Sequence, residues 1–267
     1  MPPRIYCLPA TRAPTVAVFC RGPTNWSQVG RWDLAEYRYD PGAWLHGRIF
    51  PRRSDLSSDG QFLCFVAHRP GARWEHGETY VALSKLPWLT ALYAFGTWTR
   101  GYRFNDDGGQ EDLEAPSLSI PYSLRPIPCV QFANERRRGW SEAPASPARD
   151  PVDVWDQRRD VCVQKPQPAG DRLYVESLGW AGGKLRVDQA TDSLRVRYSL
   201  EGDGNLQPLD DIQWADWDHG GRLLVATRGA KLQLWHIKGV TRAVLFEEEL
   251  SLEHPDPRPA PDWAQRW

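Results

Sequence analysis

Two neighbouring stretches decide the fold class of this chain: Asp211-Ile-Gln-Trp-Ala-Asp-Trp-Asp218-His-Gly-Gly-Arg-Leu-Leu-Val-Ala226 and Lys231-Leu-Gln-Leu-Trp-His236. Together they predict a strand, an acidic turn, a second strand, a tight turn and a third strand. Asp and Gly suit such corners because they tolerate positive φ, and Asp also bonds to its own backbone. The alternation of apolar and polar residues from Lys231 to Trp235 is typical of a strand with one face in solvent.

A weaker copy of this pattern lies far upstream, in Asp55-Leu-Ser-Ser-Asp59-Gly60-Gln-Phe-Leu-Cys-Phe-Val-Ala67. In both copies an Asp precedes an Asp-containing turn, and the turn runs straight into an apolar strand. Recurrence of one strand–turn–strand unit is the sequence signature of a repeat architecture. The recurrence indicates a fold, and it carries no information about chemistry.

Short strand candidates recur along the rest of the chain. They are rich in Val, Leu, Tyr, Phe and Trp, and Gly, Pro, Asp or Asn separate them. The candidates are Thr15–Cys20, Gln61–Ala67, Thr79–Ser84, Pro128–Phe132, Asp160–Gln164, Arg172–Ser177, Lys184–Asp188, Ser193–Leu200, Arg222–Thr227, Lys231–Ile237 and Arg242–Leu250. The apolar segment Pro87–Phe95 fits a short helix or a strand, and its aromatic content favours the strand. No segment has the periodicity of a long amphipathic helix, so we predict an all-β fold.

The two turn-containing segments resemble units of WD-repeat and TolB-type β-propellers, in which an Asp–Gly turn joins adjacent strands of each four-stranded blade. The matching residues are Asp59-Gly60 with Phe62–Val66, and Asp218-His-Gly220 with Leu223–Ala226 and Leu232–Trp235. The resemblance implies a β-propeller, and at roughly 40–50 residues per blade the chain has room for about five blades. The middle of the chain, Tyr102–Asp160, shows no clear copy. We expect one propeller-like domain over residues 1–252 and a proline-rich, extended tail over 253–267.

Composition and charge are ordinary for a globular protein, with 41% hydrophobic and 25% charged residues. A net charge of −1 at pH 7 gives no reason to expect a polyanionic partner, so we predict no nucleic-acid binding. The best apolar run near the N-terminus, Val16–Cys20, is too short for a signal peptide or a membrane span. We therefore expect a protein of a bacterial-type cytoplasm that does not contact membranes.

The cysteines and histidines do not form a recognisable metal or redox motif. The five cysteines are scattered without a C-x-x-C pair, and Cys64 and Cys162 lie within apolar alternation, as buried free thiols do. The six histidines include no H-E-x-x-H motif. We predict reduced thiols, no bound metal and no cofactor.

No motif for nucleophilic catalysis or phosphate binding is present, because the chain lacks both G-x-S-x-G and G-x-x-x-x-G-K-[ST]. The alternative function that stays open is a glycan-acting hydrolase with paired carboxylates at a propeller channel. Asp33, Asp55, Asp211 and Asp216 are the acids that could supply such a pair. Acids that precede propeller turns more often cap backbone amides, so we predict no catalytic residue.

Arginines that lie close to aromatic residues and Gly indicate a binding face. The segment Arg48–Asp55 places three Arg around a Pro, and Arg73–Gly77 and Thr97–Arg103 repeat the combination. Guanidinium groups bind carboxylate or phosphate in a bidentate manner and stack on aromatic rings. The predicted contact residues are Arg52, Arg53, Trp74, His76, Trp98 and Arg100. The predicted function is a non-enzymatic binding or scaffold module for a protein or peptide, although exposed loops of an Arg-rich chain would show the same pattern.

Overall fold

The computed structural model describes residues 3–22, 25–71, 75, 77–97, 100–105, 123–144, 161–180, 194–239, 241–250 and 255–267. Within these residues the chain forms twenty strands, one short α-helix and two 3₁₀ turns. The all-β prediction is confirmed. Among the same residues no helix has the length and apolar character needed to cross a membrane.

Two compact units divide the chain. Unit 1 comprises Cys7–Ile127 and Leu252–Trp267, and unit 2 comprises Pro2–Tyr6 and Pro128–Ser251. The predicted tail therefore groups with unit 1, where Lys85 Nζ donates a hydrogen bond to the Trp263 carbonyl oxygen at 3.0 Å. The prediction of a single domain over 1–252 stays a prediction.

Unit 1 is built from two antiparallel sheets and a two-stranded ribbon. The first sheet has the order β1-β2-β3-β4 and contains β1 (Arg4–Pro9, whose first residues belong to unit 2), β2 (Thr15–Arg21), β3 (Trp26–Asp33) and β4 (Arg38–His46). The second has the order β5-β7-β8-β9, with β6 also paired to β7, and contains β5 (Arg48–Ile49), β6 (Asp55–Leu56), β7 (Phe62–His68), β8 (Thr79–Lys85) and β9 (Tyr93–Gly96). The 3₁₀ turn η1 (Pro51–Arg53) lies between β5 and β6, and the ribbon pairs β10 (Tyr102–Phe104) with β11 (Leu124–Pro126). A second turn, η2 (Asp262–Ala264), lies near the end of the chain.

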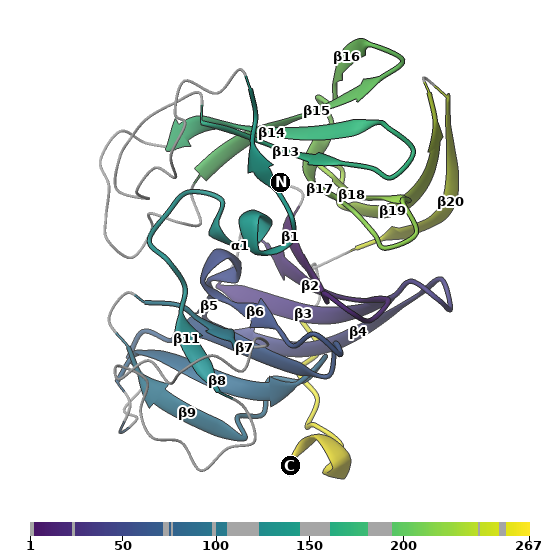
Figure 1. The fold of residues 1–267 in the computed structure, drawn as a ribbon. Helices are drawn as coiled ribbons and strands as arrows, with labels where there is room; N and C mark the ends of the chain where they lie inside the picture. Colours follow the sequence, from purple (N-terminus) through teal and green to yellow (C-terminus); the bar gives the residue numbers. More distant parts are fainter. Residues whose placement is uncertain are drawn as a thin grey trace. The chain divides into compact units, whose positions relative to one another are not determined.

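Besides the N-terminal segment, unit 2 contains helix α1 (Ala133–Arg137) and two antiparallel sheets, seen in teal to yellow-green in Figure 1. The first contains β12 (Ser141–Glu142), β13 (Cys162–Pro166), β14 (Arg172–Trp180), β15 (Leu194–Gly202) and β16 (Asn205–Pro208) in chain order. The second contains β17 (Ile212–Trp217), β18 (Leu223–Thr227), β19 (Lys231–Lys238) and β20 (Thr241–Glu249) in chain order. The N-terminal segment belongs to this unit because the Ile5 amide donates to Gln213 Oε1 at 3.0 Å and the Tyr6 ring meets the Trp214 ring edge-on.

Three of the four larger sheets are meanders whose strands follow chain order, and the fourth differs only in that β5 and β6 both pair with β7. Such meanders are the arrangement of a propeller blade. The described residues contain four such sheets, so the prediction of about five blades overcounts. The difference arises in Tyr102–Asp160, the stretch without a clear sequence copy. Its described part forms a ribbon, a short helix and β12, which do not make a further four-stranded sheet.

Both acidic turns that carry the resemblance form as expected from the chemistry of Asp. Asp59 Oδ1 accepts a hydrogen bond from the Gln61 amide at 3.0 Å, before β7. Asp218 Oδ1 accepts hydrogen bonds from the Gly220 amide at 2.9 Å and the Arg222 amide at 2.7 Å, between β17 and β18. Each Asp thus fixes a corner from which an apolar strand starts, as the sequence predicts.

Most predicted strands form within a few residues of their expected bounds, and two segments differ. Pro128–Phe132 forms a bend and a turn that lead into α1, because Pro128 has no amide proton for a ladder and Phe132 adopts φ 58°. In Pro87–Phe95 the strand starts only at Tyr93. The predicted strand Lys184–Asp188 lies outside the described residues.

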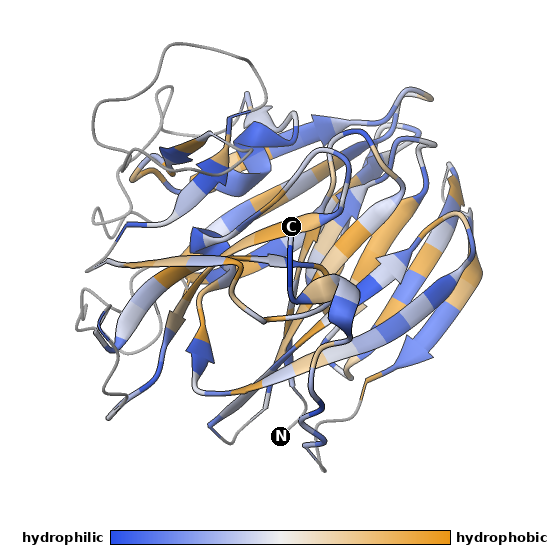
Figure 2. Cartoon of the chain, turned by 90° about the horizontal axis from the view of Figure 1, so that it is seen from below, coloured by the Kyte–Doolittle hydropathy of each residue, from blue (hydrophilic) through white to orange (hydrophobic). Residues whose placement is uncertain are grey.

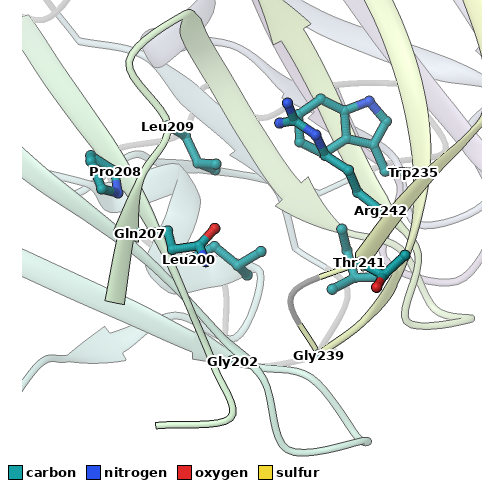
Figure 3. A pocket seen from close by; sticks show the side chains of 10 residues that line it. Leu200, Gly202, Gln207, Pro208, Leu209, Trp235, Gly239, Thr241 and Arg242 are labelled. Carbon is teal, nitrogen blue, oxygen red and sulfur yellow. The ribbon is translucent and has the colours of Figure 1, made fainter. Parts of the chain in front are cut away.

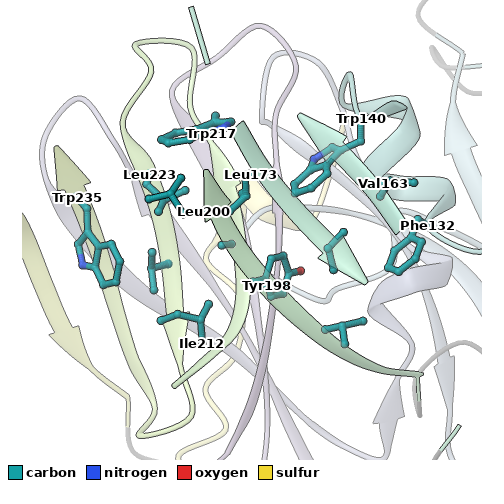
Figure 4. Packing of buried hydrophobic residues seen from close by; sticks show 14 of the residues in the cluster. Phe132, Trp140, Val163, Leu173, Tyr198, Leu200, Ile212, Trp217, Leu223 and Trp235 are labelled. Carbon is teal, nitrogen blue, oxygen red and sulfur yellow. The ribbon is translucent and has the colours of Figure 1, made fainter. Parts of the chain in front are cut away.

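Apolar and polar residues alternate along many strands (Figure 2), and the apolar ones meet in a core within each unit. In unit 2 the core lies between the two sheets and includes Trp140, Leu173, Tyr198, Trp217 and Trp235 (Figure 4). Three Trp side chains therefore lie in the core of this unit. In unit 1 a core cluster joins residues of β7 and β8 to Phe50 and to Phe104 of β10.

All five cysteines are free thiols, and they differ in exposure. Cys7, Cys20 and Cys64 are buried, and burial raises the pKa of each thiol, to about 12 for Cys20. Burial also raises the pKa of the half-buried Cys162 to about 11. Since the thiolate is the reactive species, these four thiols should react slowly in the folded protein, whereas Cys129 is exposed.

We expect a water-soluble disulfide reagent at pH 8 to modify Cys129 first in the native protein and all five thiols after denaturation. Timed mass spectrometry of the modified protein measures both. A Cys129→Ser variant, which removes the fast phase, is the control. Rapid native modification of Cys7, Cys20 or Cys64 would contradict the burial that the structure assigns to them.

Candidate functional site

The structure describes three of the six predicted contact residues: Arg52, Arg53 and Arg100. Trp74, His76 and Trp98 lie outside the described residues. Arg100 is exposed, whereas Arg53 in η1 is only 4% exposed, and its guanidinium carbon lies 4.9 Å from the centroid of the Phe50 ring. A Cβ at Gly101 would lie 2.6 Å from the Arg53 Cα, so the segment after Arg100 packs directly against the Arg53 backbone.

The structure therefore brings the Arg53 and Arg100 segments together, but it buries the first side chain, whereas the sequence predicts it on an exposed loop. Removing the Arg53 side chain would remove packing against Phe50 as well as a charge. The role of the six residues in binding stays a prediction.

Two of the candidate carboxylates lie in unit 1 and both accept backbone hydrogen bonds. Asp33 Oδ1 accepts from the Ala35 amide at 3.0 Å and the Glu36 amide at 3.1 Å, which caps the turn after β3. Asp55 is fully buried, and its Oδ2 accepts from the Phe104 amide at 3.0 Å. These contacts give both acids a structural role.

The other two candidate carboxylates lie in unit 2, where Asp211 is exposed and Asp216 is buried. Asp216 Oδ1 accepts hydrogen bonds from Lys165 Nζ at 2.7 Å, Trp217 N at 2.8 Å and Trp140 Nε1 at 3.2 Å. Burial raises the pKa of Asp216, and the positive charge of Lys165 opposes that rise. Asp216 in β17 is therefore connected to β13 by the ion pair with Lys165 and to the segment before β12 by the hydrogen bond from Trp140.

A pocket of about 350 Å³ lies in unit 2 between the β15–β16 and β19–β20 hairpins (Figure 3). The buried side chains of Leu200, Trp235 and Ile237 form an apolar floor, and the exposed Gln207, Thr241 and Arg242 form a polar rim. The lining residues are Leu200, Gly202, Gln207, Pro208, Leu209, Trp235, Ile237, Gly239, Thr241 and Arg242. A volume of this size is at the lower end of the range for ligand sites, about 300–1,000 Å³.

The register of β19 and β20 places the functional side chains of one wall. Directly opposite residues of an antiparallel pair share a face of the sheet. Two residues connect the strands, so Lys238 pairs with Thr241, Ile237 with Arg242 and Trp235 with Val244. Arg242 and Val244 consequently share the pocket face with Ile237 and Trp235.

Two glycines close one end of the pocket because the hairpin turns of the two walls approach each other there. A Cβ at Gly202 would lie 3.1 Å from the Gly239 carbonyl oxygen, and a Cβ at Gly239 would overlap the Asp203 carboxylate. Gly239 also has φ +58°, which favours glycine. A side chain at either position would therefore crowd the turns, and at Gly239 it would also strain the backbone.

A ladder of polar groups on the same face holds the Trp235 ring in place. Trp235 Nε1 donates to Gln233 Oε1 at 3.0 Å, Gln233 Nε2 donates to Glu247, and Lys231 Nζ donates to Glu247 Oε1 at 2.6 Å. The hydrogen bonds from Lys231 and Gln233 lower the pKa of Glu247. A β-bulge at Leu245 makes this ladder possible, because the extra residue puts Glu247 opposite Gln233.

Arg242 stacks on this ring at the rim of the pocket, as Figure 3 shows. Its guanidinium carbon lies 4.8 Å from the centroid of the Trp235 ring, within the range of a cation–π contact. Val244, opposite Trp235, is 52% exposed, so apolar surface continues from the pocket along β20. The site thus combines an apolar floor, an aromatic wall and a surface cation.

Trp235 and Arg242 are not among the contact residues predicted from the sequence, although both lie in predicted strands. The sequence contains a signal for this pairing. In Ile237-Lys-Gly-Val-Thr-Arg242 a two-residue hairpin turn in the middle sets Ile237 opposite Arg242. The pairing of Trp235 with Val244 follows from the same count.

Within the described residues, no group of three or more His, Cys, Asp or Glu side chains could hold a metal ion. The blade-like sheets support a propeller-type architecture, while the closer resemblance to WD-repeat or TolB-type proteins stays a prediction. No protein-family model, curated protein or solved structure matches this chain.

Proposed function

We propose that this protein is a non-enzymatic binding module that holds a peptide segment of a protein partner in the pocket between β15–β16 and β19–β20. The observation that carries the proposal is the combination of an apolar floor with the Trp235–Arg242 stack at its rim. Trp and Arg are, with Tyr, the residue types enriched among those that dominate the free energy of protein interfaces.

The size of the pocket fits side-chain insertion better than the binding of a large ligand. Burying one aliphatic or aromatic side chain of the partner against Leu200, Trp235 and Ile237 would contribute about 1.5–3 kcal/mol. The exposed Val244 extends the contact beyond the inserted residue. The bulge at Leu245 interrupts the outermost strand of this sheet, so recognition relies on side chains rather than on continuous strand addition.

Selection of a displayed random heptapeptide library on the immobilised full chain tests this proposal, with a pocket-filling variant and a matched control. Gln207 pairs with Leu200 and lines the pocket, so Gln207→Trp should fill the rim and abolish binding of the selected peptides. Leu206, the preceding exposed residue of β16, alternates to the opposite face, so Leu206→Trp should leave binding unchanged.

Fluorescence anisotropy of the selected peptides measures both effects, and thermal unfolding confirms that both variants fold. Equal peptide binding by wild type and Gln207→Trp would exclude the pocket as the binding site.

A further inference from the structure

We infer that the segment bound in this pocket carries an Asp or Glu close to the apolar side chain that enters it, with the carboxylate paired to Arg242. This inference rests on the proposed function and specifies the chemistry of the partner. It concerns a second, charged contact at the rim, distinct from the apolar floor.

The contact with Trp235 restricts the Arg242 side chain and so favours the binding of a planar anion by its guanidinium group. The guanidinium carbon lies 4.8 Å from the ring centroid, and a guanidinium group that contacts an aromatic ring through its face keeps its N–H edge for an anion. A carboxylate matches that edge with two parallel hydrogen bonds. Because the stack holds the group in place, less side-chain entropy is lost when the anion binds.

Other cations of unit 2 pair with carboxylates of the same unit. Arg197 pairs with Glu176 at 2.6 Å, Arg222 with Asp218 at 2.7 Å, and Lys231 with Glu247 at 2.6 Å. Among the residues that the structure describes, Arg242 has no such carboxylate within 4.0 Å, and its recorded side-chain contact is Trp235. A carboxylate from the partner is therefore the complement that this rim can accept.

The register also limits how far the acid can lie from the apolar residue. Ile237 on the pocket floor is the direct cross-strand partner of Arg242, and Trp235 is two residues away on the same face. Directly opposite Cβ atoms lie roughly 5 Å apart. An extended peptide rises about 3.3 Å per residue, so the acid should lie within about two residues of the apolar side chain.

The residues enriched among the selected heptapeptides provide the first test, and Arg242→Gln provides the second. We expect enrichment of a Leu, Ile, Phe or Trp with an Asp or Glu within two positions. Arg242→Gln should weaken binding of these peptides by about tenfold or more, the range of a hydrogen bond to a charged group. Arg197→Gln removes the same charge from the opposite face of β15 and should leave the affinity unchanged.

A charge reversal makes the test specific. Arg242→Glu should reject the acidic peptides and should regain binding when Lys replaces their Asp or Glu. Selected peptides that are apolar without an acid, or equal binding by wild type and Arg242→Gln, would overturn this inference and leave the proposed function standing. Binding that Gln207→Trp does not change would instead overturn the proposed function itself.

Discussion

Replacing Lys165 by Met should lower the free energy of unfolding by about 3–5 kcal/mol, because it removes the positive charge that is hydrogen-bonded to a buried carboxylate. Asp216 is 3% exposed, and Lys165 Nζ lies 2.7 Å from its Oδ1. Met has nearly the length and volume of the Lys stem, so the change removes mainly the charge. Urea denaturation gives the free energy, and hydrogen exchange of the β13 and β17 amides assigns the loss to unit 2.

The double variant Lys165→Met, Asp216→Asn is the matched control. Asn keeps an acceptor for Trp140 Nε1 and Trp217 N but carries no charge, so the double variant should recover most of the lost stability. If the single and double variants were equally unstable, the loss would come from packing rather than from the buried charge.

The free energy of unfolding of these two variants should depend on pH in a defined direction. Burial raises the pKa of Asp216 in the folded state, so the folded protein binds this proton more tightly than the unfolded chain does. Stability from this group is therefore greatest at low pH and falls as the pH rises from the ordinary Asp range through the raised pKa. In the Lys165→Met variant the pKa of Asp216 rises further, because the positive charge that opposes the rise is absent. The stability difference between the single and double variants should accordingly shrink on acidification, when Asp216 becomes neutral like Asn.

Phe104→Ala should destabilise unit 1 by about 3–5 kcal/mol, the usual cost of removing a buried aromatic side chain. Phe104 is 1% exposed and packs in the cluster that contains Phe50, Cys64 and Leu83. Its amide also donates a hydrogen bond to Asp55 Oδ2. The strand β10 could therefore move in to fill the cavity left by the substitution only if that hydrogen bond broke. Urea denaturation with hydrogen exchange of β7 and β8 measures the effect.

Phe104→Leu leaves a smaller cavity and should cost clearly less than Phe104→Ala. If both variants kept wild-type stability, β10 would not belong to the core of unit 1. If Phe104→Ala accelerated exchange in β14 and β15 as strongly as in β7 and β8, the effect would not be confined to unit 1.

The sequence predicted best those features whose chemistry is local. The turns at Asp59 and Asp218 were predicted because one carboxylate and its own neighbouring amides suffice to form them. The strands that leave these turns were predicted for the same reason. The blade count was less accurate because Tyr102–Asp160 lacks the local turn signal on which the count depended.

The candidate site could not be predicted in the same way, because it depends on cross-strand register and on burial. Trp235 and Arg242 are seven positions apart in the sequence, and the hairpin between them brings their side chains together. The bulge at Leu245 that sets the polar ladder has no clear sequence signal. Arg53 was predicted as a contact residue because Arg, aromatic residues and Gly cluster there, yet its side chain is buried and its guanidinium group lies over the Phe50 ring.

The contacts of the N-terminal segment impose an order on synthesis and folding. Strands that follow chain order can pair soon after they leave the ribosome, because their contacts are close in sequence. The hydrogen bond between Ile5 and Gln213 spans 208 positions, so it forms only after β17 has been made. The strand that holds Ile5 and Tyr6 is therefore translated long before its partners in unit 2, and these contacts form late.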